Sequence, residues 1–391
     1  MRALLRNVSA RVSTLLLAAG ATSIGVAAAP AAHADSGAVE LPRLVAPGPG
    51  FNQSLRAEIG YWTLAKMAAA GLNDDGQDAI PPQSGGDDLS KPWNDGATDG
   101  GGLIAHTAGK LFMTLKDVDN GSVHDEACSA DVVTGANQSV VVTAAHCLAV
   151  HTPFDLGAQY GMGNTLVTNV VFIPGYNGAA LPRGTTSTAL PGADIAPYGV
   201  WGATREWITA TWAGSADWAL GHDMAALLVA NPDDPRPVAQ VTGAQQIGFN
   251  LPQNQYAYMF GYPQANERNW YWSFNNNGQL ASHGVPPALW RSFDGRTLTV
   301  TRGRSQADAV YPNDVMDSAQ APGCSGGPWL QNFDPATGTG VQTGVNSRYQ
   351  DPAQGPSPLG WLVWLQGPQM EATHFGDQEQ AVWQAAQNAT L

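Results

Sequence analysis

One serine of this chain stands in a context that suits nucleophilic catalysis. Ser325 lies in the run Gly323-Cys324-Ser325-Gly326-Gly327-Pro328. A serine hydroxyl is a weak nucleophile at its free pKa, so it needs a neighbouring base and an acid that orients this base. The glycines around Ser325 let the backbone turn tightly enough for amide N–H groups to face a developing oxyanion. The run therefore predicts a nucleophilic serine.

His146 is the predicted base. It follows the apolar, β-branched run Val140-Val141-Val142-Thr143 and two alanines, and Cys147 comes directly after it. Small residues beside a catalytic histidine leave space for a substrate and for a carboxylate behind the ring. The remaining histidines that we compared lack this setting, and we expect them to be surface or core residues: His106, His124, His151, His222, His283 and His374.

The runs around His146 and Ser325 resemble the catalytic blocks of the trypsin/chymotrypsin family of serine peptidases. Two further runs, Ile173-Pro174-Gly175-Tyr176 and Pro197-Tyr198-Gly199-Val200-Trp201, are similar to secreted bacterial trypsin-like peptidases, in which an insertion separates the histidine from the acid. The resemblance implies an all-β fold of two packed antiparallel β-barrels with a C-terminal helix. An N-terminal extension would precede the barrels.

Three aspartates precede apolar residues and are candidates for the acid: Asp194, Asp217 and Asp223. The resemblance places the acid at the head of a buried strand. Asp194 is soon followed by Pro197, which interrupts a ladder, and Asp217 reaches Gly221 after three residues. Only Asp223 leads a sustained apolar run. We therefore prefer Asp223, with Asp217 second and Asp194 third.

The run around Ser325 also satisfies the G-x-S-x-G pattern of α/β-hydrolases, whose serine sits on a turn into a helix. Gly326-Gly327-Pro328 is a poor opening for a helix, and the one histidine after Ser325 is His374. The order His146, Asp223, Ser325 matches the chymotrypsin-type order instead. We therefore expect a lipase or esterase of the α/β type to be the weaker interpretation.

Three cysteines in an exported protein leave one pair and one single thiol. Cys128 and Cys147 are the natural pair, and they match the disulfide that the resembling family has around its histidine. Cys324 is then unpaired, and it stands where most trypsin-like enzymes have an aspartate that binds a newly cut N-terminus. We therefore expect activity that does not depend on such a salt bridge, and a buried, thiol-bearing Cys324.

Substrate contacts are the least readable part of the site. The resemblance implies an oxyanion hole from the N–H groups of Gly323 and Ser325. Substrate-binding positions are implied at Ala319, where enzymes that prefer Lys or Arg usually have Asp, and at Ser347 in the run Gly344-Val345-Asn346-Ser347. Ala319 argues against strict tryptic specificity, while Asp317, two residues earlier, leaves an acid in this region as an alternative.

The first residues read as a secretory signal, with Arg2, Arg6 and Arg11 before an apolar stretch and Ala32-His33-Ala34 as the cleavage site. Removal of residues 1–34 leaves 15 basic and 32 acidic residues, a net charge of −17. A charge of this sign argues against a nucleic acid or an anionic membrane as a partner. We expect a secreted, extracellular monomer.

The composition, with 45 glycines and 27 prolines, favours an all-β body. We expect a signal peptide (1–34), an extension or pro-segment (35–107) with one helix and an acidic glycine-rich linker, a first barrel (108–235) with His146 and Asp223, and a second (236–391) with Ser325. Residues 35–50 are expected to be unstructured, 52–70 to form one helix, and 377–388 a final helix capped by Asp377. The expected strands are 110–115, 130–133, 140–143, 166–173, 225–229, 256–260, 297–301, 341–345 and 361–365.

Together these features predict a secreted serine endopeptidase that hydrolyses peptide bonds through a His146-Asp223-Ser325 triad and an acyl-enzyme. The expected partner is a polypeptide substrate, and no metal or organic cofactor is expected. The alternative from another class is a non-catalytic secreted binding protein on a peptidase-like scaffold. Degenerate members of that kind usually lose a triad residue, and none is lost here.

Overall fold

The computed structural model describes residues 37–42, 44–71, 91–93, 101–117, 121–149, 165–215, 221–264, 270–274, 280–284, 295–308, 311–318, 320, 322–350 and 369–391. The expected signal peptide and the expected strand at 361–365 lie outside these residues, as does most of the acidic linker expected at 73–102. Residues Ala34–Leu391 form one compact unit, which is described below.

The first sheet closes into a barrel. Its strands follow the order β7-β6-β3-β4-β5-β8, and a ladder between β7 and β8 completes the ring. The strands of the ring are antiparallel neighbours. Their bounds are β3 (Ala108–Asp117), β4 (Val123–Val132), β5 (Val140–Thr143), β6 (Thr165–Pro174), β7 (Trp201–Thr209) and β8 (Ala225–Ala230).

Apolar side chains from every strand fill this barrel. Val140, Val142 and Leu227 are fully buried in it, as are Leu111 and Phe172. β-Branched and aromatic residues suit a pleated surface that is packed on both faces. The barrel therefore forms the larger core of the molecule, and it holds β5 and β8 side by side.

The second sheet curls but stays open in the part of the chain that the structure describes. Its strand order is β14-β15-β18-β17-β16-β10-β13-β2, with β9 beside β17. No ladder among the described residues joins β13 to β15, although the Thr301 and Ser318 hydroxyls lie 3.1 Å apart there. The bounds are β2 (Lys91–Pro92), β9 (Gln246–Ile247), β10 (Tyr256–Gly261), β13 (Thr299–Arg304), β14 (Gln306–Ala307), β15 (Asn313–Asp317), β16 (Pro328–Asp334), β17 (Thr339–Gln350) and β18 (Gln369–His374).

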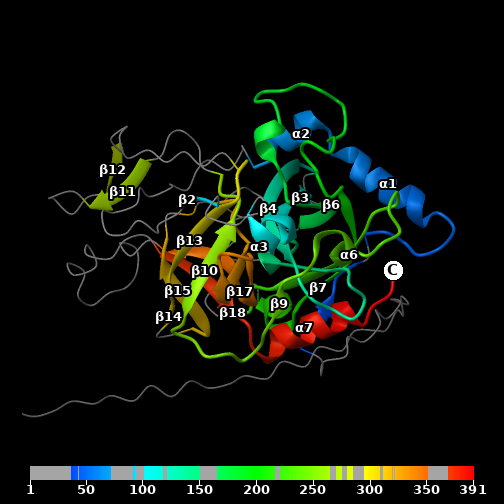
Figure 1. Cartoon of the computed structure of the whole chain (residues 1–391). Helices are drawn as coiled ribbons and strands as arrows, with labels where there is room; N and C mark the ends of the chain where they lie inside the picture. Colours follow the sequence, from blue (N-terminus) through cyan, green and yellow to red (C-terminus); the bar gives the residue numbers. More distant parts are fainter. Residues whose placement is uncertain are drawn as a thin grey trace, which may run out of the picture. The chain divides into compact units, whose positions relative to one another are not determined.

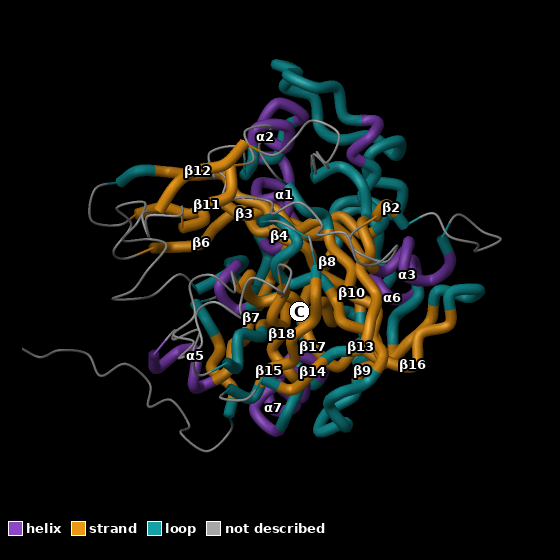
Figure 2. Tube along the Cα trace, turned by 90° about the vertical axis from the view of Figure 1, so that its left-hand side faces the viewer, coloured by secondary structure: helices purple, strands orange, loops and turns teal. Residues whose placement is uncertain are grey.

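The all-β, two-barrel fold class is thus confirmed, with a closed first barrel and a curled half-barrel as its partner. Figure 2 shows that strands dominate the described body. The other elements are the hairpin β11 (Trp270–Phe274) and β12 (Leu280–Gly284), with α5 (Ala210–Ser215), α6 (Val238–Thr242), η1 (Ala145–Cys147) and η2 (Gly178–Ala180). No helix within the described ranges combines the length and the apolar character that crossing a bilayer requires.

The N-terminal segment is more ordered than the sequence suggested. Residues 38–40, expected to be unstructured, form β1 (Ala38–Glu40) and pair with residues 207–209 of β7. The ladder between β6 and β7 spans only two residue pairs, so the far end of β7 offers an edge that β1 completes. A short apolar strand finds this edge only once the barrel has formed.

The single helix expected at 52–70 is two helices, α1 (Phe51–Tyr61) and α2 (Leu64–Ala69). The helical path breaks at Trp62, whose fully buried indole donates to the Asn169 carbonyl in β6 at 2.5 Å. Thr63 then caps α2 by accepting the Lys66 N–H. Burial of the indole against the barrel therefore outweighs continuation of the helix.

Two further helices, α3 (Gly102–Thr107) and α7 (Asp377–Gln387), adjoin the first barrel. α3 leads directly into β3. α7 matches the helix expected at 377–388, but its N-cap is Gly376, whose N–H donates to the Glu379 carboxylate at 2.9 Å. Val382 and Ala386 of α7 belong to the core of the first barrel, so the end of the chain packs under that barrel (Figure 1).

Candidate active site

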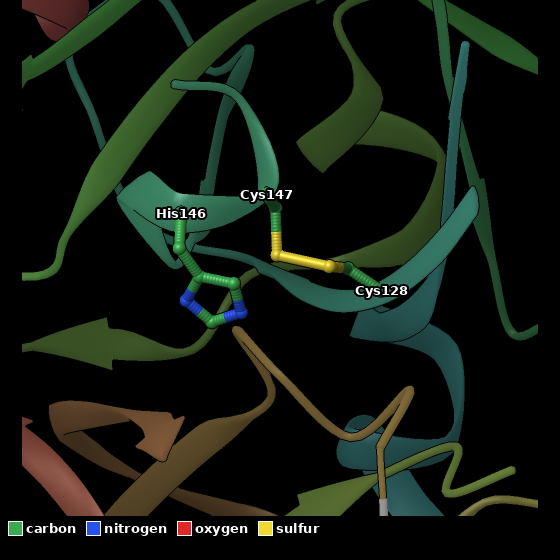
Figure 3. A group of neighbouring side chains, drawn as sticks. All are labelled: Cys128, His146 and Cys147. Atoms are coloured by element: carbon green, nitrogen blue, oxygen red, sulfur yellow. A yellow bond between two sulfur atoms is a disulfide. The ribbon is translucent and has the colours of Figure 1, made fainter. Parts of the chain in front are cut away.

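His146 lies in η1, the short helical turn that follows β5. A disulfide joins Cys147, the next residue, to Cys128 of β4, and the two Cα atoms are 6.4 Å apart (Figure 3). The expected pairing is therefore present. The bridge fixes the turn that carries the imidazole to the neighbouring strand of the same barrel.

The imidazole and the two sulfur atoms lie within 4.8 Å of one another. A thiolate, and not a disulfide sulfur, is the form of cysteine that binds a metal ion. Since Cys128 and Cys147 are joined to each other, this group lacks the ligands for a metal site. The sulfur atoms lie close to the imidazole because the disulfide is next to His146 (Figure 3).

Asp223 stands at the head of β8 and is fully buried. Its carboxylate accepts two hydrogen bonds from His146, one from the backbone N–H and one from Nδ1, both at 2.8 Å. The Ser347 hydroxyl donates to the same carboxylate at 2.7 Å, and the Asp223 N–H donates to the Thr373 hydroxyl at 3.1 Å. Four contacts therefore fix this side chain and its backbone.

These contacts also fix the tautomer of the ring. A carboxylate only accepts hydrogen bonds, so Nδ1 of His146 must carry the proton in its bond to Asp223. In the neutral ring Nε2 then holds the lone pair. The exposed fraction of the His146 side chain is 15%, against 0% for Asp223, so the ring reaches towards the surface from a buried acid.

Asp194, another candidate acid, makes contacts elsewhere. Asp194 is exposed, and its backbone carbonyl accepts a hydrogen bond from the Asn177 amide. Asp217 lies outside the described residues. Among the three aspartates, the structure brings Asp223 to His146.

Ser325 is partly exposed in the loop between β15 and β16. Hydrogen bonds hold the backbone carbonyls of Ser325 and of the residues before it. The Pro322 carbonyl accepts the Gln264 N–H at 2.6 Å, the Gly323 carbonyl accepts the Ser129 hydroxyl at 2.8 Å, and the Ser325 carbonyl accepts the Ser129 N–H at 2.7 Å. The backbone of the loop is thus fixed peptide by peptide.

The peptide between Cys324 and Ser325 is held in the same way. The Cys324 carbonyl accepts the side-chain amide of Asn346 and the N–H of Gly327, both at 2.9 Å. In a trans peptide the N–H points away from its carbonyl. The N–H groups of Gly323 and Ser325 therefore point away from the donors that hold their peptides, and neither has a hydrogen-bond acceptor among the described residues. This is the arrangement that an oxyanion hole requires.

Gly326 brings the serine loop against the strand that leads to His146. Its φ is 78°, and an added Cβ would collide with the Thr143 hydroxyl and lie 2.5 Å from the Ser129 carbonyl and 2.7 Å from the Ala144 nitrogen. Only glycine permits both this conformation and this approach. The Ser325 loop therefore packs directly on the residues that precede His146.

Cys324, next to the serine, is 2% exposed and points into an apolar cluster. Burial raises the pKa of its thiol to about 12. The cysteine is unpaired and thus stays a neutral thiol, the state that suits a small apolar core residue. Its neighbours in the cluster are Ala257, Met259, Met316, Trp329, Met370 and Ala372.

The predicted substrate positions are only partly visible. Ala319 lies outside the described residues. The adjoining Gln320 is buried, and its amide donates to the Met259 carbonyl at 3.1 Å. The Ser347 hydroxyl is engaged by Asp223, so any substrate contact at this position falls to its backbone.

Sequence reasoning missed three residues that hold the site: Ser129, Asn346 and Thr373. Ser129 follows Cys128 directly, which was a usable signal, since any residue beside that bridge lies close to His146. Asn346 was quoted as part of a strand, but its amide also reaches the Phe260 carbonyl at 2.9 Å and its oxygen accepts the Trp329 indole at 2.6 Å. Nothing in the sequence marked Thr373.

Comparisons with known proteins address the fold. No family model matches this chain, and no curated protein matches it in sequence. Among solved structures, the protease Anisep from Arthrobacter nicotinovorans is similar, with 23% identity over 73% of this chain and 96% of its own, at a TM-score of 0.50. The thermostable serine protease AL20 from an extremophilic microorganism is similar at 24% identity, over 74% of this chain and 100% of its own, at a TM-score of 0.50. The chain therefore has the fold of trypsin/chymotrypsin-like serine peptidases.

Proposed function

We propose that this protein is a serine endopeptidase that cleaves polypeptides through His146, Asp223 and Ser325. The observation that carries the proposal is the hydrogen bond from Nδ1 of His146 to the buried Asp223 carboxylate. In the Ser325 loop, hydrogen bonds to the backbone carbonyls leave the N–H groups of Gly323 and Ser325 pointing the other way. A hydrolase on this scaffold needs both elements. The similar solved structures, both described as proteases, support the same reaction class.

The proposed reaction follows from the groups present. Ser325 Oγ attacks the carbonyl carbon of the substrate while Nε2 of His146 takes the hydroxyl proton, and Asp223 stabilises the imidazolium. The N–H groups of Gly323 and Ser325 bind the oxyanion of the tetrahedral intermediate. The imidazolium gives its proton to the leaving amine as the C–N bond breaks, which leaves an acyl-enzyme. Water, deprotonated by the same imidazole, then releases the acid and restores Ser325. The reaction needs no metal or organic cofactor.

We further propose that the chain acts outside the cell as a monomer, with residues 1–34 removed and with neither nucleic acid nor membrane as a partner. The disulfide next to His146 supports an oxidising compartment, because such bridges persist in exported proteins. The net charge of −17 expected after cleavage supports the absence of polyanionic partners.

Labelling with a fluorophosphonate tests the proposal. The wild-type protein should take up one label, which peptide mapping should place on Ser325, and it should cleave casein. Ser325→Ala should abolish labelling and lower kcat by about 10⁶. Ser54→Ala, which changes an exposed serine of α1, is the matched control and should label as the wild type does. Folded wild-type protein that neither labels nor cleaves casein would favour the binding-protein alternative.

A further inference from the structure

Ser129 links the two halves of the site through a single side chain. It lies on β4 of the first barrel, directly after Cys128 of the disulfide, and is 1% exposed. Its hydroxyl donates to the Gly323 carbonyl at 2.8 Å and accepts the N–H of Tyr262 at 2.8 Å. Tyr262 follows β10 of the second sheet, so one hydroxyl joins the first barrel, the serine loop and the second sheet.

The backbone of Ser129 adds two more bonds at the same place. Its N–H donates to the Ser325 carbonyl at 2.7 Å, and its carbonyl accepts the Thr143 hydroxyl at 2.8 Å. Thr143 lies three residues before His146 in the chain. Ser129 therefore contacts the segment before the base as well as the segment that contains the nucleophile.

The partner of the hydroxyl is a glycine with a positive φ. Gly323 has a φ of 91°. A glycine occupies positive and negative φ with similar ease, so its flanking peptides have alternative orientations that another residue would not have. Its carbonyl accepts the Ser129 hydroxyl and belongs to the Gly323–Cys324 peptide. This peptide joins the two peptides that carry the proposed oxyanion donors, the N–H groups of Gly323 and Ser325. Loss of the hydroxyl would free the Gly323–Cys324 peptide to rotate and would change the orientation of the two donors relative to each other.

The residue that most trypsin-like enzymes use to order this loop is absent here. Cys324 stands at the position of their buried aspartate, and its neighbours in the core are apolar. A neutral thiol forms no ion pair with an amino terminus. The loop therefore relies on hydrogen bonds, and the Ser129 hydroxyl supplies one of them to Gly323.

We propose that Ser129 is a positioning residue for the oxyanion hole, whose hydroxyl holds Gly323 in the orientation that the transition state requires. This inference rests on the proposed peptidase function. It predicts a loss of transition-state stabilisation with little change in substrate binding, because the ground-state carbonyl makes less use of the oxyanion donors.

The test compares Ser129→Ala and Ser129→Gly, both without the hydroxyl, with Thr204→Val. Thr204 is a matched control because its buried hydroxyl also donates to a carbonyl of the first barrel, that of Leu228, at 2.9 Å. For each protein, kcat and KM on fluorescein-labelled casein are measured together with hydrogen exchange in the segment 322–327, whose exchangeable backbone amides are those of residues 323–327. The two Ser129 variants should lose about tenfold in kcat with KM unchanged, which corresponds to about 1.4 kcal/mol, and should exchange faster at 322–327.

The control decides between positioning and plain stability. Thr204→Val should keep its kcat and its exchange at 322–327, although its melting temperature falls. An unchanged kcat in either Ser129 variant that folds, or an equal loss in Thr204→Val, would overturn the proposal. If the wild type itself fails to label at Ser325, the peptidase function fails separately, and hydrogen exchange then decides alone: equal exchange at 322–327 in the wild type and in the Ser129 variants overturns the positioning role.

Discussion

The two sides of the candidate site each place a cysteine beside a reactive residue, yet they hold their loops by different means. On the histidine side, Cys147 is tied covalently to Cys128, and Asp223 bonds His146 from within the same barrel. On the serine side, Cys324 is a buried free thiol. The serine loop depends on hydrogen bonds in place of a covalent bridge.

The sources of those bonds differ as well. β4, η1 and β8, which hold His146, all belong to the closed first barrel. The donors to the serine loop come from both halves: Ser129 from the first barrel, and Gln264 and Asn346 from the second half of the chain. The turn that carries His146 is therefore held within one sheet, although its acid, Asp223, also bonds Ser347 and Thr373 of the second sheet. The serine loop draws the donors that hold its own carbonyls from both sheets.

The largest effect is expected from the acid of the histidine side. Asp223→Asn keeps the size of the side chain but offers an amide to Nδ1 of His146, which favours the wrong tautomer. We expect kcat on casein to fall by about 10⁴ while the fold is kept. The exposed Asp194→Asn is the control and should leave kcat unchanged. Equal losses in the two variants would contradict the assignment of the acid.

On the serine side, Cys324→Asp restores the acid that the resembling family has at this position. The cluster around Cys324 is apolar, so a carboxylate would be buried without a charged partner. We expect a loss of about 3 kcal/mol or more in the free energy of unfolding. Cys324→Ala should cost much less, because it leaves only a small cavity. Urea denaturation of both variants measures the difference, and a stable Cys324→Asp protein would reveal a counterion for this site.

Removal of the bridge tests the covalent clamp of the histidine side. The double variant Cys128→Ala, Cys147→Ala opens a loop with a sequence separation of 19 residues. We expect it to lose about 3 kcal/mol of stability, measured by urea denaturation. Wild-type protein treated with a reductant is the control and should lose a similar amount. If both proteins keep the stability of the oxidised wild type, the contrast between the two sides disappears.

A smaller effect is expected at the back of the first barrel, where β7 carries Glu206. Burial and, to a lesser extent, the charge of Glu58 on α1 raise the pKa of Glu206 to about 8. Between about pH 4.5 and pH 8, Glu206 is protonated in the folded protein but ionised in the unfolded chain. The free energy of unfolding should therefore fall as the pH rises from about 4.5 to 8. The slope from one such group is at most about 1.4 kcal/mol per pH unit.

Glu206→Gln removes this proton and should be more stable than the wild type at pH 8 and equal to it at pH 4, by urea denaturation at both values. Burial also raises the pKa of Asp131 to about 8, so some pH dependence should remain in the variant. Glu206 lies on β7, away from the 322–327 loop in the chain, and kcat of Glu206→Gln at a fixed pH should equal that of the wild type. An identical stability profile in the two proteins would contradict the raised pKa of Glu206.

The strands that the sequence predicted are those with apolar patterns, and the missed ones carry buried polar residues. The runs at 140–143 and 225–229 coincide with β5 and β8. β15 and β18 were missed because Asn313, Asp314 and Glu371 interrupt any apolar alternation. These side chains are buried in bonded groups, such as Glu371 with Asn313 and Arg348, and Asp314 with His374. A polar partner far along the chain cannot be read from local periodicity.

For the site, the motifs around His146 and Ser325 were sufficient to name a base and a nucleophile, because turns and strand ends impose local residue types. The choice of Asp223 also followed from a local pattern, the apolar run after it. Ser129 and Asn346 could not be identified in this way. Each is an ordinary residue in its own strand, and each acts on a loop 22 to 194 residues away.

By itself, the sequence predicted the base, the acid and the nucleophile from local residue types and spacing. Its resemblance to trypsin-like peptidases was sufficient to predict the partner of Cys147 and the two-barrel fold, both of which the structure has. Only the tertiary structure decided which groups hold the serine loop, how the free Cys324 is buried and where Trp62 ends a helix. The physical reason is the same in each case. Hydrogen bonds and burial between distant segments depend on how the sheets pack, and they leave no periodic trace along the chain.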